Sequence, residues 1–308
     1  MRIAIYPKTP IQKMFSNIII CSIFSFSLFL SGCGSKPINP YGNDFIGERA
    51  YRDIAYQVNL GPRVPGSEAH KKAGLYIVNE LKVAGWNTVI QELEFEGQMI
   101  RNIIASRGKG ERTILLGAHY DSRMAADRDP DLDKRDQPVI GANDGGSGVA
   151  VLLELARVLP KELEIKVQLV FFDAEDNGGI SGWDWILGSR AYVDQLKEYP
   201  DMVIIIDMVG DTDLNIFFEN NSNSEISASI WGKASELGYD AFIPMSKFSI
   251  IDDHTPFLRA SIPAVDIIDF DYPYWHTSAD TLDKVSAKSL EVVGDTLLQW
   301  ILEQNDDL

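Results

Sequence analysis

The stretch VQLVFFDAED, Val167–Asp176, carries the clearest signal for the fold. Its first six residues are almost all apolar, and such a continuous run is typical of a strand that is covered on both faces. The run ends in Asp173, Glu175 and Asp176. The sequence therefore predicts a buried strand whose carboxyl end presents acidic side chains.

Three further apolar runs have the same character, namely TILLGA (113–118), MVIIIDMV (202–209) and PAVDIID (263–269). Between and after them, helical spacing of apolar residues occurs at 148–159, 224–238 and 286–303. Strands that alternate with helices predict an α/β fold with a mostly parallel sheet and helices on both faces. The polar clusters HYDS, DAED and DMVGD each follow an apolar run, so we expect a ligand site at the carboxyl edge of the sheet.

The first 44 residues are expected to lie outside the folded domain. Basic residues precede an apolar run at 18–30, and the small residues of LSGC then lead to Cys33. This layout resembles a bacterial lipoprotein signal, which implies cleavage after residue 32 and a lipid on Cys33. A run of about 13 residues is short for a membrane-spanning helix, which needs roughly 20. A generic signal peptide or a short membrane anchor is the alternative.

These features predict three segments: a signal peptide at 1–32, a lipidated tether at 33–44 and a catalytic domain at 45–308. The tether sequence GSKPINPYGN is rich in Gly, Pro, Ser and Asn, as flexible linkers are. The expected location is the periplasmic side or the outer surface of a bacterial membrane. The charged stretch 126–138, which is bounded by proline, predicts a long surface loop.

Charge and cysteine content exclude several classes of function. The chain has a net charge of −17, and without residues 1–32 it would keep 25 basic and 45 acidic residues, a net charge of −20. Such an acidic surface argues against nucleic-acid binding and against docking on anionic lipid, so membrane contact would come only from the lipid on Cys33. The one other cysteine, Cys21, lies in the signal, which excludes disulfides, cysteine catalysis and thiolate zinc sites from the mature chain.

The candidate ligands for a metal are imidazoles and carboxylates. They are His119 and Asp121 in HYDS, Asp144 in GANDGGSG, the pair Glu175 and Asp176, Asp207 and His276. This donor set without sulfur suits a catalytic zinc with an open coordination position. Asp121 could orient His119 from behind. Taken singly, Asp144 could merely cap the next helix, and the acidic pair could form a solvated turn.

Taken together and in this order, these motifs resemble the zinc-dependent aminopeptidase and glutaminyl cyclase superfamily. The resemblance extends from NLGPRVPGSEAHKKAG, Asn59–Gly74, to the C-terminal helix. It implies a single globular α/β domain with a mixed, mainly parallel central sheet. It also implies a zinc enzyme that acts on the free N-terminus of a peptide or protein. A non-catalytic binding module on the same fold is a weaker alternative, because such relatives usually lack ligands and none is missing here.

The superfamily contains two reactions that share this pocket. In the glutaminyl cyclases, one zinc held by residues at the positions of Asp144, Asp176 and His276 polarises the side-chain amide of an N-terminal glutamine. Glu175 would transfer the proton, and Asp207 and Asp252 would form the acidic network behind it. In the aminopeptidases, two zinc ions would use His119 and Asp207 as additional ligands, and Glu175 would deprotonate a water.

Trp275 tilts the prediction toward the cyclase. The cyclases carry Trp-His-Thr at this point, and their indole lines a small pocket for the glutamine side chain, which makes Trp275 a candidate substrate-binding residue. An aromatic residue that only plugs the core rim is the alternative. Of the remaining histidines, we expect His254 to be a structural hydrogen-bonding residue and His70, beside two lysines, to be exposed to solvent.

Overall fold

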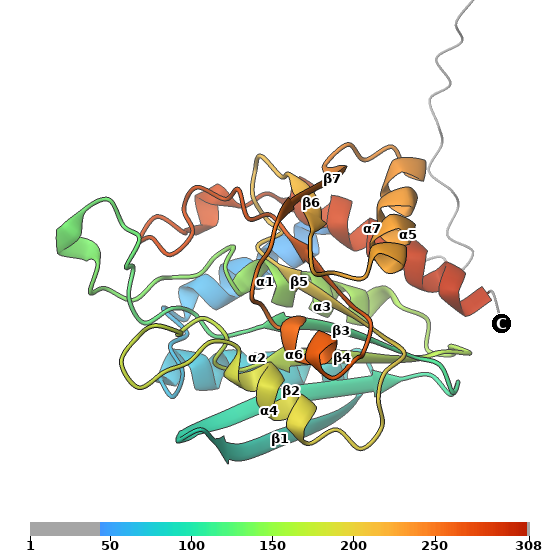
Figure 1. Cartoon of the computed structure of the whole chain (residues 1–308), viewed down its shortest axis with the longest axis horizontal. Coiled ribbons are helices and arrows are strands. Elements are labelled where there is room, and N and C mark those ends of the chain that lie inside the picture. Colours follow the sequence, from blue (N-terminus) through green and yellow to red (C-terminus); the bar gives the residue numbers. More distant parts are fainter. Residues whose placement is uncertain (1–43, 307–308) are drawn as a thin grey trace, which may run out of the picture. The chain divides into compact units, whose positions relative to one another are not determined.

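A six-stranded sheet in the order β1-β2-β4-β3-β5-β8 organises the computed structural model, which describes residues 44–306 (Figure 1). The strands are β1 (Asn87–Phe95), β2 (Gln98–Arg107), β3 (Thr113–His119), β4 (Lys166–Phe172), β5 (Met202–Asp207) and β8 (Ala264–Ile268). β4, β3, β5 and β8 run parallel, while β1 and β2 form an antiparallel hairpin that joins β4 through β2. The predicted mixed, mainly parallel sheet is confirmed.

Helices cover both faces of this sheet. They are α1 (Gly47–Asn59), α2 (Glu68–Val83), α3 (Gly146–Val158), α4 (Leu187–Asp194), α5 (Ser224–Glu236), α6 (Thr255–Arg259) and α7 (Ala287–Asp306). Short 3₁₀ turns occur at Leu132–Lys134 and Leu282–Lys284, and β6 (Ile216–Glu219) pairs with β7 (Phe242–Phe248) in a separate parallel sheet. The expected signal peptide and Cys33 lie outside the described residues.

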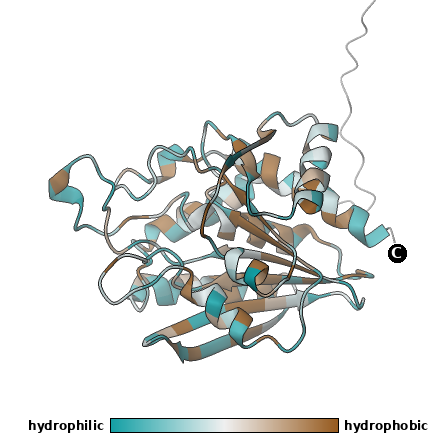
Figure 2. Ribbon diagram, in the orientation of Figure 1, coloured by the Kyte–Doolittle hydropathy of each residue, from teal (hydrophilic) through white to brown (hydrophobic). Residues whose placement is uncertain are grey.

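Burial on both faces explains the continuous apolar runs. Along β4, Val167, Leu169 and Phe171 face a large core that includes residues of α1, α2, α3 and α7. Val170 and Phe172, which alternate with them, face a second core that includes Tyr192 and Phe257 from the other side. Figure 2 shows the resulting apolar interior of the sheet and the polar outer helix faces. No helix among the described residues is long and apolar enough to cross a membrane.

The parallel strands bring the polar clusters to one edge. His119 ends β3 and is paired with Phe172 at the end of β4, so the acids that follow β4 lie beside it. Asp207 ends the neighbouring β5. The carboxyl edge that the sequence predicts as a ligand site is therefore built from three adjacent strands.

A close approach of α3 to the sheet places the turn that precedes this helix. A Cβ atom at Gly148 would lie 2.1 Å from the carbonyl oxygen of Ile206 and 2.9 Å from the Cβ of Ala118. Only glycine permits this approach. By contrast, a Cβ at Gly232 in α5 would have no heavy atom within 4 Å.

The same substitution should therefore have opposite effects in the two helices. Gly148→Ala is expected to lower the free energy of unfolding by about 1–3 kcal/mol, because the backbone must shift. Gly232→Ala should raise it by roughly 0.5–1 kcal/mol, because alanine favours the helix. Thermal denaturation of both variants measures this, and equal shifts of the melting temperature in one direction would contradict the packing described here.

Glu219, at the end of β6, fixes the loop that leads into α6. Its carboxylate accepts backbone hydrogen bonds from Asn221 (2.9 Å), Ser222 (2.8 Å) and Ile250 (3.1 Å). The imidazole of His254 lies 3.3 Å from it. Burial alone would raise the pKa of Glu219, but these donors lower it from 4.5 to about 2. The ionised carboxylate therefore ties the small sheet to the loop around Ile250.

Because the pKa of Glu219 is lower in the folded than in the unfolded protein, the free energy of unfolding depends on pH. The stabilisation by Glu219 is complete above pH 4.5 and is lost as the pH falls toward about 2. Glu219→Gln should reduce the unfolding free energy at neutral pH by on the order of 2 kcal/mol and flatten its slope in this window. Denaturant titrations at several pH values measure both effects. Glu162→Gln, at an exposed pair with Lys109, serves as the control that should change little.

Candidate active site

Asp144, Asp176 and His276 converge at the carboxyl edge, and all three are buried. The Nε2 of His276 lies 2.7 Å from Asp176 Oδ1 and 3.7 Å from Asp144 Oδ2. One ligand atom from each of the three residues lies within 4.8 Å of the others. The structure thus brings together the three residues predicted as ligands of a single zinc.

His119 and Asp207 form a second group that shares Asp144. The Nε2 of His119 lies 3.1 Å from Asp144 Oδ1 and 3.2 Å from Asp207 Oδ1. Asp144 thus offers one oxygen to each group. The geometry therefore provides both the single site and the additional ligands of a two-metal site.

The donors fit a divalent cation such as zinc. Within residues 44–306, the Oδ2 atoms of Asp144 and Asp176 are buried without a hydrogen-bond partner. A buried carboxylate oxygen without a partner is costly, and a cation removes this cost. Imidazole nitrogen and carboxylate oxygen at close range are the ligands of catalytic zinc sites.

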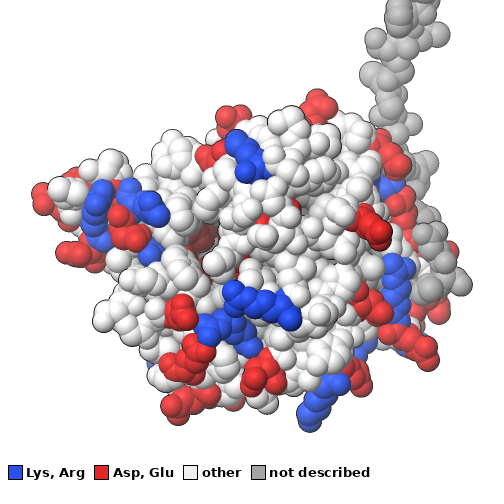
Figure 3. Space-filling view, in the orientation of Figure 1, with Lys and Arg blue, Asp and Glu red and all other residues white. Residues whose placement is uncertain are grey.

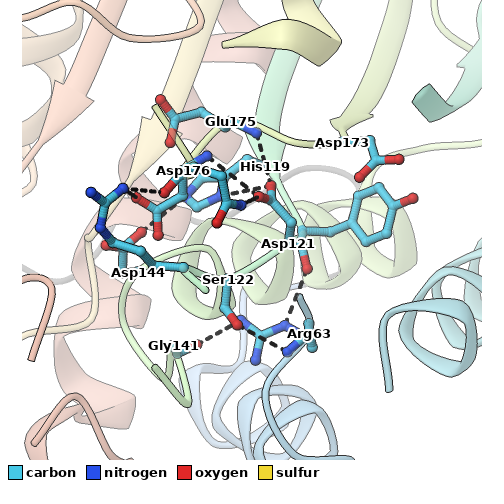
Figure 4. A network of polar contacts seen from close by, with 12 residues as sticks. Arg63, His119, Asp121, Ser122, Gly141, Asp144, Asp173, Glu175 and Asp176 are labelled. Carbon is cyan, nitrogen blue, oxygen red and sulfur yellow. Dashed lines mark hydrogen bonds and ion pairs between the residues drawn. The ribbon is translucent and has the colours of Figure 1, made fainter. Parts of the chain in front are cut away.

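Asp121 holds several of these groups from behind. Its Oδ1 lies 3.4 Å from His119 Nδ1, and its carboxylate accepts the backbone N–H of Glu175 (3.0 Å) and of Asp176 (3.3 Å) (Figure 4). The carboxylate of Glu175 points away from Asp121 in this view, whereas Asp176 lies in the metal-ligand group. The two adjacent acids therefore face different surroundings, as the sequence indicates.

Two buried residues that the sequence analysis missed support the turn around Asp144. Asp280 accepts the backbone N–H of Asn143 (2.9 Å) and Asp144 (3.1 Å). Arg63 donates to three backbone carbonyls, among them Gly141 O at 2.7 Å. Asp280 lies only four residues after His276, but the sequence holds no signal for its contact with a turn that lies 136 residues away.

The ionisable groups at the carboxyl edge are buried close together, and their pKa values are shifted from the ordinary values. Burial raises the pKa of Asp207 to about 7, although a hydrogen bond with His119 opposes the rise. Burial also raises the pKa of Glu175 well above its usual value, and the charges of Asp252 and Asp176 add to it. Burial alone would lower the pKa of His119, but its three carboxylate neighbours hold it well above the ordinary value. The surroundings of Glu175 thus favour its protonated form, as expected of a group that takes up a proton in a reaction.

A cavity of about 320 Å³ opens onto the metal-ligand group. All of the predicted catalytic residues line it, namely Glu175, Asp207 and Asp252, together with Trp275. Figure 3 shows acidic atoms in a hollow near the middle of this face, with mostly uncharged residues around it and basic residues just below it.

Two indoles flank His276 at this cavity. The ring of Trp275 lies 3.9 Å from the imidazole of His276, measured between centroids. The ring of Trp185 stacks on the same imidazole at 6.0 Å and also lines the cavity. Trp275 therefore contacts both the metal-ligand group and the cavity, as the sequence predicts for a substrate-binding residue.

Backbone strain accompanies the site. Ala174, Met208 and His276 have φ values of 55°, 46° and 56°. Few residues other than glycine adopt this left-handed region, and such strain gathers at functional sites. The first two adjoin Glu175 and Asp207, so each strand end turns sharply where its acid is presented.

The remaining histidines lie away from the metal-ligand groups. His254 is fully buried, with Nε2 3.3 Å from Glu219 and Nδ1 3.6 Å from Asp266, but within residues 44–306 neither ring nitrogen makes the expected hydrogen bond. The prediction for His70 is wrong, because only 6% of its surface is exposed and its Nε2 lies 2.8 Å from Asp173 Oδ1. The first turn of α2 packs this side chain against Tyr120, with the rings stacked at 4.7 Å, while the flanking lysines take the solvent side.

Comparison with known proteins agrees with this architecture. The crystal structure of Porphyromonas gingivalis glutaminyl cyclase superposes with a TM-score of 0.81 at 33% identity, covering 85% of this chain and 99% of that one. A Zn-dependent exopeptidase from Parabacteroides distasonis gives a TM-score of 0.77 at 35% identity, covering 84% and 98% of the two chains. The glutaminyl-peptide cyclotransferase of Drosophila melanogaster is 27% identical over 278 residues, which cover 76% of this chain and 75% of that protein.

The profile of Peptidase family M28 matches residues 102–301. This segment contains both metal-ligand groups and every residue that lines the cavity. Since it spans more than half of the chain, the protein belongs to Peptidase family M28.

Proposed function

We propose that the protein is a glutaminyl-peptide cyclotransferase, which converts the N-terminal glutamine of a peptide or protein to pyroglutamate and releases ammonia. One observation carries the proposal: Glu175, Asp207, Asp252 and Trp275 line a single cavity beside the Asp144, Asp176 and His276 group. The similarity to solved structures of glutaminyl cyclases supports it.

One zinc ion held by Asp144, Asp176 and His276 would polarise the side-chain carbonyl of the glutamine. Glu175 accepts a proton from the α-amino group as its nitrogen bonds to the side-chain carbonyl carbon. Glu175 then gives this proton to the amide nitrogen, whose bond to the same carbon breaks, and ammonia leaves. No water is consumed, so the reaction balances with one proton moved through one carboxylate.

Asp207 and Asp252 assist Glu175 in this scheme. Asp252 lines the same cavity as Glu175 and Asp207, and its charge contributes to the raised pKa of both. An acid network of this kind receives the substrate amino group and strengthens the affinity of Glu175 for the proton that it takes from the amine. Trp275 would line the pocket for the glutamine side chain, and the two indoles would keep water from it.

The group formed by His119, Asp144 and Asp207 favours a second candidate function. With a second zinc bound there, Glu175 would activate a water for hydrolysis of the N-terminal peptide bond, as in an aminopeptidase. The similarity to a Zn-dependent exopeptidase agrees with this alternative equally well.

A product assay separates the two functions. Residues 34–308, loaded with zinc, are incubated with a Gln-initiated and a Leu-initiated peptide, while ammonia and free amino acid are measured separately. We expect ammonia from the first peptide, whose chain remains otherwise intact, and no leucine from the second. Release of leucine without ammonia would replace the cyclase by the aminopeptidase.

Two controls accompany this assay. Glu175→Gln should reduce the rate by at least about a hundredfold, because the proton carrier is lost, and it should leave zinc bound. Loss of zinc instead would show that Glu175, not Asp176, is the ligand of the pair. Metal analysis of the active protein should find one zinc per chain, and two tightly bound ions would favour the peptidase.

We further propose that the chain is exported and anchored to a bacterial membrane by a lipid on Cys33. The basic residues, the apolar run and the LSGC sequence at the N-terminus support this. The acidic charge of the remaining chain offers no other means of attachment to anionic lipid.

Lipidation can be measured by labelling the full chain with a radioactive fatty acid during expression in bacteria. The wild-type protein should be labelled and sediment with membranes, whereas Cys33→Ser should be unlabelled. Cys21→Ser, within the proposed signal, is the matched control and should be labelled normally. An unlabelled wild-type protein would refute the anchor.

A further inference from the structure

Arg123 is a buried arginine that contacts both Asp176 of the metal-ligand group and Trp185 of the cavity wall. Only 2% of its surface is exposed, although a buried guanidinium requires several partners. It follows the HYDS motif directly and begins the loop that leads into the charged stretch 126–138. Its contacts run in three directions.

The first contact leads to His276. Arg123 binds the carboxylate of Asp127 with two parallel hydrogen bonds, from Nε to Oδ1 at 2.8 Å and from Nη2 to Oδ2 at 2.9 Å. The same Oδ1 of Asp127 lies 3.6 Å from His276 Nδ1. Because Nε2 of His276 faces Asp144 and Asp176, Asp127 is the carboxylate on the opposite side of the imidazole. A carboxylate in that place fixes the orientation of a metal-binding histidine.

The second contact holds the strand end that carries the acids. Nη1 of Arg123 donates to the carbonyl of Asp176 at 2.5 Å and lies 3.9 Å from its Oδ1. Nη2 also donates to the carbonyl of Gly178 at 3.3 Å. These bonds fix the backbone directly after the acidic pair.

The third contact supports a wall of the cavity. The guanidinium lies over the ring of Trp185, 5.0 Å from its centroid. Gly178 provides the space for this indole, since a Cβ there would lie 2.1 Å from it. Trp185 thus lies in contact with Gly178 and near both Arg123 and the imidazole of His276.

We propose that Arg123 is a positioning residue that couples metal binding to substrate fit. With one side chain it orients His276 through Asp127 and holds Trp185 against the cavity. Lysine cannot replace it, because an ammonium lacks both the planar fork and the flat face that covers the indole. The proposal rests on the proposed function only where KM is measured, because zinc affinity can be measured without the reaction.

Three variants separate the contacts. Zinc affinity is measured by competition with a chelator, and KM and kcat are measured with a Gln-initiated peptide. Asp127→Asn should weaken zinc binding about tenfold with little change in KM. Trp185→Phe should raise KM and leave zinc affinity unchanged. Arg123→Lys should both weaken zinc binding and raise KM. The double variant with Arg123→Lys and Asp127→Asn should bind zinc only slightly more weakly than Arg123→Lys alone.

Arg190→Lys is the matched control. Arg190 also pairs with carboxylates, Glu96 and Asp184, and lies over an aromatic ring, that of Phe95, but it lines no part of the cavity. It should change neither readout. Zinc binding as tight in Arg123→Lys as in the wild type, or an unchanged KM, would overturn the coupling.

Folding and function are kept apart in this design. If Arg123→Lys does not fold, Asp127→Asn still tests the contact with His276, because the Asp127 side chain is 45% exposed and its loss disturbs no core. Wild-type zinc affinity in a folded Asp127→Asn would then refute this part of the proposal. If the protein makes no ammonia at all, the cyclase proposal fails, while the zinc measurements still decide the role of Arg123.

Discussion

Repulsion among buried carboxylates at the carboxyl edge is the constraint that the rest of the structure must meet. Asp144, Asp176, Asp207 and Glu175 gather there with two imidazoles, and all are buried. Like charges in a low dielectric repel strongly unless protons or cations are shared among them. Burial raises the pKa of Asp207 and of Glu175, and the charges of the neighbouring carboxylates add to the rise. A bound cation would relieve this repulsion. The stability of this edge of the sheet would therefore depend on whether the metal site is occupied.

The surrounding groups keep these acids in place against that repulsion. Asp121 and Asp280 accept backbone N–H groups from the segments that carry the acids, and Arg63 and Arg123 donate to carbonyls of the same turns. The arrangement uses fixed dipoles of the backbone together with the ion pair between Arg123 and Asp127. Groups held in this way need little reorganisation when charge develops in a reaction.

Sequence patterns were sufficient for the parallel strands and for the acids at their ends. Continuous apolar runs are specific to strands covered on both faces, and His119, Asp144, Asp176, Asp207 and His276 come together as expected. β1 and β2 were not predicted, because β1 has one open face and no continuous apolar run.

Contacts that depend on the tertiary fold were missed. Asp280 and Arg123 act on backbone groups far away in the chain, which no local pattern records. His70 was misplaced because its lysine neighbours dominate the local composition, whereas the helix turns its ring toward Asp173. In each case the partner, rather than the residue itself, determines the role.

The sharing of Asp144 between two ligand groups has a consequence for how such enzymes diverge. Asp144 belongs to both groups of candidate ligands, so the same aspartate could hold one metal ion or take part in holding two. A change of reaction would therefore not have to begin with the gain or loss of a ligand. It could begin in the walls of the cavity, which Trp185 and Trp275 line and where, on the proposed function, they would contact the substrate. Within such a lineage, ligand sequences would stay constant while chemistry changes, and the record of that change would lie in the aromatic residues around the metal.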